Sequence, residues 1–476
     1  MSKYIETIGI EVHVELKTKS KIFSSSENGY GMSANSLTNV IDLGYPGTLP
    51  TINSEVIKIA CRAAKVLHCS IRHHMHFDRK NYFYPDNPKN YQITQARTPI
   101  GYNGYVEIEE EDGTKKKIEI EEMHIEEDTC KSAHRKDVTL LDFNRAGVPL
   151  IEIVTKPCIE SPEDAKLYIE KLRETLFYAD ISDCKMEEGS MRCDANISLR
   201  KSTSDPLGTK VEVKNIGSIS NVKLALEKEK IRQTELLDKG ESFREQTRRF
   251  DSKLNDTVLM RYKETGNDYR YFPEPDIPFI NLTDEFISDA LKTIPLMPDE
   301  RRSLYKEKGM SKTNIYHLIL NKGLSDFLDD VIERVDAQTA SNLLLGDIES
   351  YLNKKNKSIY DTKLTKDKFI DLCNKVSSKE LSSRNVKEVL IDVLESDKTL
   401  DEIIKEKGIS NITDTSKIED VINKVINENE ESVSDYISGK DRALKFLMGM
   451  VMKETHGSVN PAVASSLLKK KLDSLK

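Results

Sequence analysis

The stretch IGIEVHVEL, residues 8–16, decides the fold of the first part of the chain, because apolar and polar residues alternate along it. Apolar side chains occupy every second position, and the positions between them include Glu11, His13 and Glu15. A period of two predicts a β-strand with one buried face and one polar face. Because a half-buried antiparallel strand ordinarily turns its polar face to water, this strand alone leaves open whether that face forms a site.

Further segments extend the pattern outward from this strand. Similar short, strand-like segments lie at 104–109, 116–121, 148–154, 191–199 and 209–214, and helix-periodic segments lie at 162–178 and 219–237. Antiparallel strands mixed with packed helices, without regular strand–helix alternation, predict an α+β fold. Beyond about residue 294 the segments become long, charged and helix-periodic. We therefore predict three domains, over 1–293, 294–405 and 406–476.

The composition is that of a globular protein with a heavily charged surface. Of 476 residues, 37% are hydrophobic and 32% charged, and no apolar run approaches the roughly 18–20 residues of a membrane span. The N-terminus lacks the apolar core of a signal peptide, and the seven cysteines form no C-x-x-C pair. These features predict a cytoplasmic protein in a reducing compartment, with no membrane partner.

The charge distribution bears on nucleic-acid partners. The formal net charge of −8 gives no global basic field, and we expect no DNA partner. Residues 441–476 nevertheless hold seven Lys or Arg against three Asp or Glu. Such a local basic segment fits a module that faces RNA or a protein partner, and it also fits a helical hairpin with a solvated charged face.

Polar faces recur on the other predicted strands. Segment 191–200 places Arg192, Asp194, Asn196 and Ser198 on one face, segment 209–215 does the same with Lys210, Glu212 and Lys214, and segment 123–131 adds His124, Glu126, Glu127 and Asp128. Glu152 interrupts the apolar run of residues 149–154. A carboxylate in such a run is expected to be paired or bound to a metal if it is buried.

If these strands share a sheet, their carboxylates crowd together and need cations. Two unit charges 4 Å apart repel by about 4 kcal/mol at an effective dielectric near 20. Mg²⁺ takes oxygen ligands and is commonly bound together with phosphates. Arg192, Lys210 and Lys214 are then the expected counter-charges for phosphate oxygens. The pattern predicts metal-assisted phosphoryl transfer.

Other chemistries find little support in the sequence. It contains no G-x-x-x-x-G-K-[ST] loop, no strand-linked G-x-G-x-x-G and no G-x-S-x-G, and nothing in it favours hydrolysis of glutamine. Segment 77–92, FDRKNYFYPDNPKNYQ, mixes Arg79 and Lys80 with several aromatic residues. Stacking and phosphate contacts there suit ATP or the 3′ end of a tRNA, and a structural aromatic cluster is the alternative.

The chain resembles the B-subunit family of bacterial aspartyl/glutamyl-tRNA amidotransferases nearly from end to end. The motifs that carry the resemblance are IGIEVHVELKTKSKIF, FDRKNYFYPDNPKNYQI, HIEEDTCKS, DFNRAGVPLIEIV, MEEGSMRCDANIS, KVEVKNIGS, DYRYFPEPDIP and ALKFLMGMVMKETHGSVNP. The resemblance implies a catalytic cradle domain similar to the glutamine synthetase fold, built on an antiparallel sheet, followed by an all-α helical domain and a small helical tail domain that binds tRNA.

The resemblance also implies a reaction and partners. ATP phosphorylates the side-chain carboxylate of glutamate mischarged on tRNA(Gln) or of aspartate on tRNA(Asn), and ammonia then displaces phosphate. An amidase subunit supplies the ammonia, and a heterotrimer forms with a small third subunit. Two alternatives remain: a non-catalytic tRNA-binding scaffold, and a small-molecule amide ligase of the glutamine synthetase type.

Site residues follow from the matched motifs. Glu11 and His13 fall at Mg²⁺-site positions of the family, Glu127, Asp194 and Glu212 are further matches, and Glu126 and Glu152 are weaker ones. The expected catalytic residues are Glu11, His13, Glu127, Asp194 and Glu212, and the expected nucleotide contacts are Arg79, Lys80, Arg192, Lys210 and Lys214.

The identity of the metal is less constrained. An imidazole among carboxylates suits Mn²⁺ better than Mg²⁺, so either ion fits. Many relatives carry C-x-C and C-x-x-C motifs where this chain reads FSSSEN and TNVIDLGYPG, so no zinc is expected. We expect packing and backbone hydrogen bonds to hold that loop instead.

Overall fold

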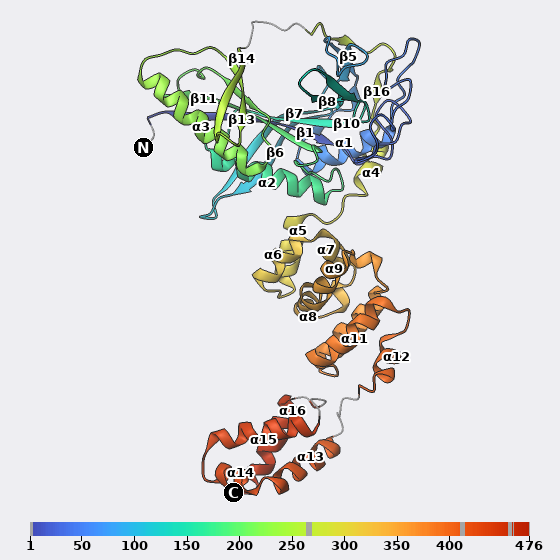
Figure 1. The fold of residues 1–476 in the computed structure, drawn as a ribbon, viewed down its shortest axis with the longest axis vertical. Helices are drawn as coiled ribbons and strands as arrows, with labels where there is room; N and C mark the ends of the chain where they lie inside the picture. The colour runs from blue at the N-terminus through green and yellow to red at the C-terminus, as the bar shows by residue number, and fades with distance from the viewer. Residues whose placement is uncertain (1–2, 263–268, 410–414, 456–458, 460, 476) are drawn as a thin grey trace. The chain divides into compact units, whose positions relative to one another are not determined.

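The strand predicted from residues 8–16 lies at the centre of a nine-stranded sheet (Figure 1). The computed structural model describes residues 3–262, 269–409, 415–455, 459 and 461–475. In spatial order the strands are β14 (Asp256–Tyr262), β13 (Gln246–Asp251), β12 (Val211–Lys214), β11 (Met191–Arg200), β1 (Ile5–Glu15), β10 (Pro149–Thr155), β7 (Lys115–Glu127), β6 (Gly101–Glu109) and β2 (Ser70–Ile71). Neighbours pair antiparallel except β12 and β13, which are parallel.

Helices cover one face of this sheet. They are α1 (Ser54–Val66), α2 (Pro162–Tyr178) and α3 (Ile219–Asp238) (Figure 1). Helix α2 begins as the sequence predicts, because Ser161 caps its N-terminus by accepting a hydrogen bond from the Asp164 amide and Pro162 follows at the first helical position. The apolar residues of β1 face this layer, and Ile10, Val12 and Val14 are fully buried.

Shorter strands and one more helix complete the first part of the chain. They are β3 (His74–Met75), β4 (Asp78–Asn81), β5 (Tyr91–Thr94), β8 (Lys131–His134), β9 (Thr139–Asp142), β15 (Phe272–Pro273), β16 (Ile280–Asn281) and α4 (Asp284–Leu291). The strands form a three-stranded sheet, β15–β4–β5, and two antiparallel two-stranded pairs, β16–β3 and β8–β9.

The chain divides into two compact units, 1–298 and 299–476. All described elements of the second unit are helical. Its α-helices, beginning at the boundary, are α5 (Pro298–Glu307), α6 (Lys312–Leu320), α7 (Lys322–Asp329), α8 (Ala337–Leu343), α9 (Glu349–Lys355), α10 (Lys366–Ser377), α11 (Ser383–Glu395), α12 (Leu400–Glu406), α13 (Thr415–Glu428), α14 (Glu430–Ile437), α15 (Asp441–Glu454) and α16 (Pro461–Asp473). Short helical turns lie at Ile332–Arg334, Leu344–Ile348 and Ile359–Asp361.

The described residues of the second unit form two hydrophobic clusters. One runs from Tyr305 to Ile403 and the other from Ile418 to Leu472. A large sheet with packed helices followed by helices confirms the α+β class predicted from the sequence. Among the described residues, no helix is both long and apolar enough to span a membrane.

Candidate metal centre

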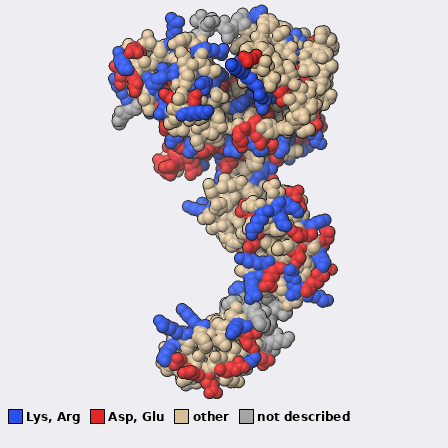
Figure 2. All heavy atoms as spheres, viewed as in Figure 1, with Lys and Arg blue, Asp and Glu red and all other residues tan. Residues whose placement is uncertain are grey.

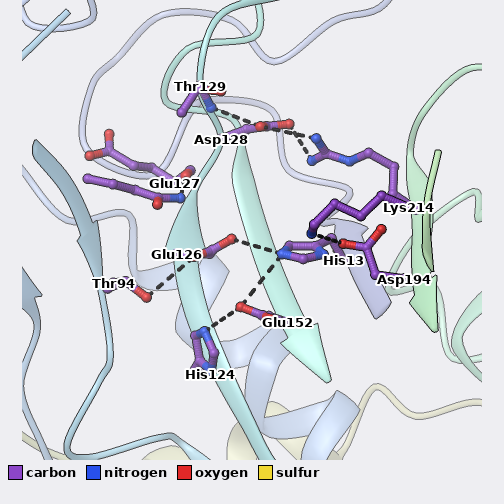
Figure 3. Close-up of polar contacts among 12 residues, drawn as sticks. His13, Thr94, His124, Glu126, Glu127, Asp128, Thr129, Glu152, Asp194 and Lys214 are labelled. Carbon is purple, nitrogen blue, oxygen red and sulfur yellow. Dashed lines mark hydrogen bonds and ion pairs between the residues drawn. The ribbon is translucent and has the colours of Figure 1, made fainter. Parts of the chain in front are cut away.

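The polar face of β1 is the floor of the candidate site. Alternation places Glu11 and His13 on the face opposite the buried valines. The register then brings partners from both neighbouring strands, because Asp194 of β11 stands opposite Glu11 and Glu152 of β10 stands opposite His13. The predicted co-facing of these polar side chains is therefore present in the structure (Figure 3).

The first group of potential ligands consists of His13, Glu126 and Glu152, which we call the histidine group. The Nε2 atom of His13 lies 3.6 Å from a carboxylate oxygen of Glu126 and 3.6 Å from one of Glu152 (Figure 3). His124 Nε2 lies 2.9 Å from the same Glu152 oxygen. One ligand atom from each member of the group lies within 4.8 Å of the others.

Charge and burial oppose each other in the histidine group. Burial raises the pKa of Glu126, which is 3% exposed, although His13 partly counteracts it. Burial also acts to raise the pKa of Glu152, but the hydrogen bond to His124 and the nearby His13 outweigh it and lower that pKa overall. Burial acts to lower the pKa of His124, whereas its bond to Glu152 raises it and prevails.

The second group consists of Glu11, Asp194 and Glu212, which we call the carboxylate group. One oxygen from each lies within 4.8 Å of the others. Lys214 Nζ contacts two of them, at 2.6 Å from Asp194 Oδ2 and 3.0 Å from Glu212 Oε1. Burial acts to lower the pKa of Lys214, but these two carboxylates outweigh it and raise the pKa, so Lys214 is a cation at neutral pH.

Neutral side chains orient the carboxylate group. Asn196 Nδ2 donates a 2.8 Å hydrogen bond to Glu11 Oε1, and Thr247 Oγ1 donates a 3.0 Å bond to Glu212 Oε2. Such bonds fix the direction of ligand oxygens before a cation arrives. The sequence carried a signal for Asn196, because it shares the alternating face of Asp194, but Thr247 lies on a strand whose pairing the sequence did not reveal.

Both donor sets fit a hard divalent cation. Three carboxylates offer only oxygen, which Mg²⁺ and Mn²⁺ accept, while the imidazole of the histidine group favours a transition metal such as Mn²⁺. Ligands of one such ion sit about 2.0–2.6 Å from it, so donor atoms within 4.8 Å of one another need only a small closure.

Glu127 lies outside both groups. Lys89 Nζ contacts its carboxylate at 2.5 Å, and the Ile93 amide donates to it at 2.8 Å. Figure 3 shows Glu127 pointing away from the side of β7 on which Glu126 meets His13. The resemblance ranked Glu127 above Glu126, whereas the structure places Glu126, and not Glu127, in the histidine group.

The predicted nucleotide contacts are more scattered. Arg79 is paired with Glu274 through two bonds, of 2.6 and 2.9 Å. Arg192 Nη2 lies 2.6 Å from Asp128. Lys80 Nζ lies 5.0 Å from the centre of the Tyr269 ring, and its charge acts to lower the pKa of the histidine-group carboxylates.

Two more of the residues predicted to contact the nucleotide lie beside the carboxylate group. Lys214 joins it directly, and the exposed Lys210 borders a cavity that also touches Glu11.

The loop at residues 21–42 is held by side chains as well as by its backbone. Ser24 and Ser26 donate hydrogen bonds of 2.6 and 2.5 Å to the two carboxylate oxygens of Asp42. The fully buried Lys21 places Nζ 3.3 Å from Asp42. The expectation that packing and backbone bonds would hold the loop missed this side-chain network, because Asp42 lies at least 16 residues along the chain from its partners.

Two known protein families match this chain. The family described as "GatB/GatE catalytic domain" matches residues 6–288, and the family described as "GatB domain" matches residues 326–472. The sheet and its polar floor thus lie within a catalytic domain of a known class, and the chain belongs to the GatB family.

Individual relatives extend the match over nearly the whole chain. The chain is 47% identical to the B subunit of the aspartyl/glutamyl-tRNA(Asn/Gln) amidotransferase of Lactiplantibacillus plantarum, over 98% of each chain. It is 47% identical to the protein of the same name in Limosilactobacillus reuteri, over 98% of each chain, and 48% identical to that of Geobacillus thermodenitrificans, over 97% of each chain. These relatives confirm the family that the sequence motifs indicated.

Proposed function

We propose that this chain is the ligase subunit that amidates Glu-tRNA(Gln), Asp-tRNA(Asn) or both at the expense of ATP. The relatives bear the name of the B subunit of that enzyme. The observation that carries the proposal is the presence of two potential cation-binding groups on one sheet face, with the cationic Lys214 in contact with one of them. Phosphoryl transfer requires such concentrated positive charge around the transferred group.

In the proposed reaction, a carboxylate oxygen of the mischarged amino acid attacks the γ-phosphorus of ATP, and the bond to the β–γ bridging oxygen breaks. The ammonia nitrogen then attacks the carbonyl carbon of the acyl phosphate, phosphate leaves, and the nitrogen loses a proton. Mg²⁺ or Mn²⁺ held by the two groups would neutralise the polyphosphate charge. Lys214 and Lys80 supply fixed positive charge at the same face.

The site residues take these roles within the proposal. Glu11, Asp194 and Glu212 hold one cation, and His13, Glu126 and Glu152 hold another, with His124 orienting Glu152. Glu127 has a structural role, because its ion pair with Lys89 stabilises the end of β7 beside the site. Arg79, paired with Glu274, holds β4 to the segment that follows β15 rather than contacting phosphate.

The proposal assigns partners and domains. An amidase subunit supplies ammonia, and the complex, which works in the cytoplasm, includes a small third subunit. Residues 1–293 form a glutamine-synthetase-like cradle, 294–405 a helical domain and 406–476 a tRNA-binding tail. Lys469, Lys470 and Lys471 are exposed on α16, and Figure 2 shows Lys and Arg side chains gathered along one side of the C-terminal helices on the face in view.

An amidation assay tests the proposal. The heterotrimeric complex is incubated with Glu-tRNA(Gln) or Asp-tRNA(Asn), with and without ATP. We expect ATP-dependent formation of the amide on at least one tRNA, and no hydrolysis of glutamine by the isolated chain. If this chain were only a scaffold, the complex would still cleave ATP after Asp194 is changed to Asn. If it were a small-molecule ligase, it would amidate free glutamate.

A further inference from the structure

Three tyrosines from segments far apart in the sequence form a cluster in the first unit. They are Tyr82, which follows β4, and Tyr269 and Tyr271, which precede β15, and we call them the tyrosine cluster. The pairing of β15 with β4 brings the two segments together. The ring of Tyr269 contacts both others edge to face, with its centroid 6.4 Å from that of Tyr82 and 5.9 Å from that of Tyr271.

Neighbouring side chains fix the backbone of the tyrosine cluster rather than its rings. Asn81 Nδ2 donates hydrogen bonds of 3.2 Å to the Tyr269 carbonyl and 3.0 Å to the Arg270 carbonyl. Arg97 Nη2 donates a 3.0 Å bond to the Tyr271 carbonyl. Arg270, between the two tyrosines, has a φ of +48°, a conformation that is costly for its side chain and that surrounding contacts must hold. The cluster is therefore preorganised for a ligand.

Tyr271 is the member of the cluster whose ring is most available to a ligand. Lys80 Nζ lies 5.0 Å from the centroid of the Tyr269 ring, which Tyr82 and Tyr271 also contact. Tyr82 and Tyr269 are half-buried, whereas Tyr271 is 37% exposed. Among the described residues, Tyr269 is the only one whose ring contacts the Tyr271 ring. Tyr269 is thus the packed centre of the cluster, and Tyr271 is its outer face.

The sheet that carries the tyrosine cluster borders the histidine group. β15 and β5 flank β4, and Thr94 of β5 donates a 3.4 Å hydrogen bond from Oγ1 to Glu126 (Figure 3). The charge of Lys80 acts to lower the pKa of Glu126 and of Glu152. Burial, and to a lesser degree the same two carboxylates, raise the pKa of Tyr271 to about 12. Lys80 and Tyr271 are therefore within electrostatic reach of the histidine group.

We propose that the ring of Tyr271 stacks on the terminal adenine of the mischarged tRNA; the inference rests on the proposed function. The aminoacyl group is an ester of that last nucleoside, so the nucleoside must lie within about one amino-acid length of the transferred phosphoryl group. An aromatic ring beside a cation binds an unpaired base and its neighbouring phosphate. Tyr271 supplies the ring, and the exposed Arg97, which is bonded to the Tyr271 carbonyl, supplies the charge.

The exposure of the cluster favours a polynucleotide end over a free nucleotide. Tyr271, Arg270 and Arg97 are all exposed, so this part of the cluster is a rim and not an enclosed pocket. A polynucleotide must continue outward from its last base, and a rim permits this. A free nucleotide is better held by a pocket that buries most of its surface. ATP at Tyr271 is therefore an outcome that would overturn the assignment.

A comparison of two tRNA forms in the heterotrimeric complex tests the proposal. We compare tRNA(Gln) that ends in CCA with the same tRNA lacking the terminal adenosine, which removes the base assigned to Tyr271. In filter binding, the wild-type complex is expected to bind the complete form about tenfold more tightly, within the roughly 5- to 150-fold that stacking of one base contributes. Tyr271→Ala should bind both forms equally. Tyr271→Phe keeps the ring and should keep the wild-type difference.

Kinetics and a matched variant separate this contact from general damage. Tyr271→Ala is expected to lower kcat/KM for mischarged tRNA about tenfold and to leave the KM for ATP unchanged. Phe279→Ala removes a ring that is 70% exposed on the same segment and contacts His76, and this variant should bind both tRNA forms as the wild type does. If Tyr271→Ala does not fold, Tyr271→Leu keeps apolar bulk without an aromatic face and should lose most of the difference.

The outcomes that would overturn the assignment are distinct. Equal affinity of the wild-type complex for the two tRNA forms is one, and a difference that persists in Tyr271→Ala is another. A raised KM for ATP in Tyr271→Ala would assign the ring to the nucleotide, and loss of the heterotrimer in gel filtration would assign it to a subunit interface. The binding comparison does not involve ATP, so failure of the proposed function would appear separately, as amide formation by the wild-type complex that does not depend on ATP.

Discussion

The histidine group and the carboxylate group meet on β1, where His13 and Glu11 lie two residues apart, yet they neutralise their charge differently. The histidine group contains an imidazole, and the neighbouring His124 orients one of its carboxylates. The carboxylate group is all oxygen and already holds an internal cation, Lys214. A metal ion entering the carboxylate group must therefore compete with Lys214. Among the residues that the structure describes, no Lys or Arg contacts the carboxylates of the histidine group. The comparison predicts two cation sites of unequal affinity.

The largest expected effect comes from removing a ligand charge. Glu11→Gln and Asp194→Asn are each expected to lower the rate of amide formation by about 100- to 1,000-fold, because a stabiliser of the transferring phosphoryl group is lost. Affinity for tRNA should hardly change. Single-turnover amidation and filter binding measure the two quantities, with the exposed Glu119→Gln of the same sheet as control. Near-normal turnover in both variants would mean that the carboxylate group takes no part in phosphoryl transfer.

A structural carboxylate provides the contrast to both groups. Glu229 of α3 is fully buried, accepts hydrogen bonds from Arg232 and from Thr257 Oγ1 at 2.5 Å, and forms an ion pair with Arg248 at 2.9 Å. Burial acts to raise its pKa, but these partners, Arg232 foremost, lower it overall. Because the surrounding protein supplies its counter-charges, Glu229 belongs to the fold rather than to a cation site.

Glu229→Gln is accordingly expected to cost about 2 kcal/mol of unfolding free energy at pH 7 and no metal affinity. The folded pKa is lowered, so this contribution is present above the unfolded value near 4.5 and is lost as pH falls through the folded pKa. The difference between wild type and variant in denaturant melts should shrink from pH 7 to pH 4. The prediction would be wrong if this stability difference stayed constant with pH, or if Glu227→Gln on the same helix lost as much unfolding free energy as Glu229→Gln.

The internal cation offers a direct way to sharpen the comparison. Lys214→Met removes the positive charge that contacts the carboxylate group. The affinity of that group for Mn²⁺ should then rise about tenfold, which corresponds to only a fraction of the roughly 4 kcal/mol by which two unit charges interact at close range. Binding to the histidine group should not change. Titration of Mn²⁺ followed by electron paramagnetic resonance resolves the two sites, and Lys156→Met, whose partner is the distant Glu119, is the control.

Alternation along single strands predicted the floor, and contacts between distant segments limited what it could predict. Glu11, His13, Asp194 and Glu212 could be assigned because strand period fixes which face a side chain takes. The ion pair of Arg79 could not be predicted, because its partner Glu274 lies far along the chain. Glu126 and Glu127 show the same limit, since only the positions of Lys89 and of the Ile93 amide reveal what Glu127 contacts.

The smallest expected effect belongs to α16 in the second unit, where three consecutive lysines are exposed rather than gathered into a buried group. Changing Lys469, Lys470 and Lys471 to alanine is expected to weaken tRNA binding and to flatten the plot of log affinity against log salt by roughly one to two units, because each neutralised phosphate contributes about 0.7–0.9. ATP-dependent amidation should survive at saturating tRNA, because the potential cation groups lie in the first unit. A matched triple variant at the exposed Lys354, Lys355 and Lys357 controls for loss of net charge and should keep the wild-type slope. An unchanged slope in the α16 variant would mean that these lysines do not touch tRNA phosphates, and that the basic side of the tail serves solvation alone.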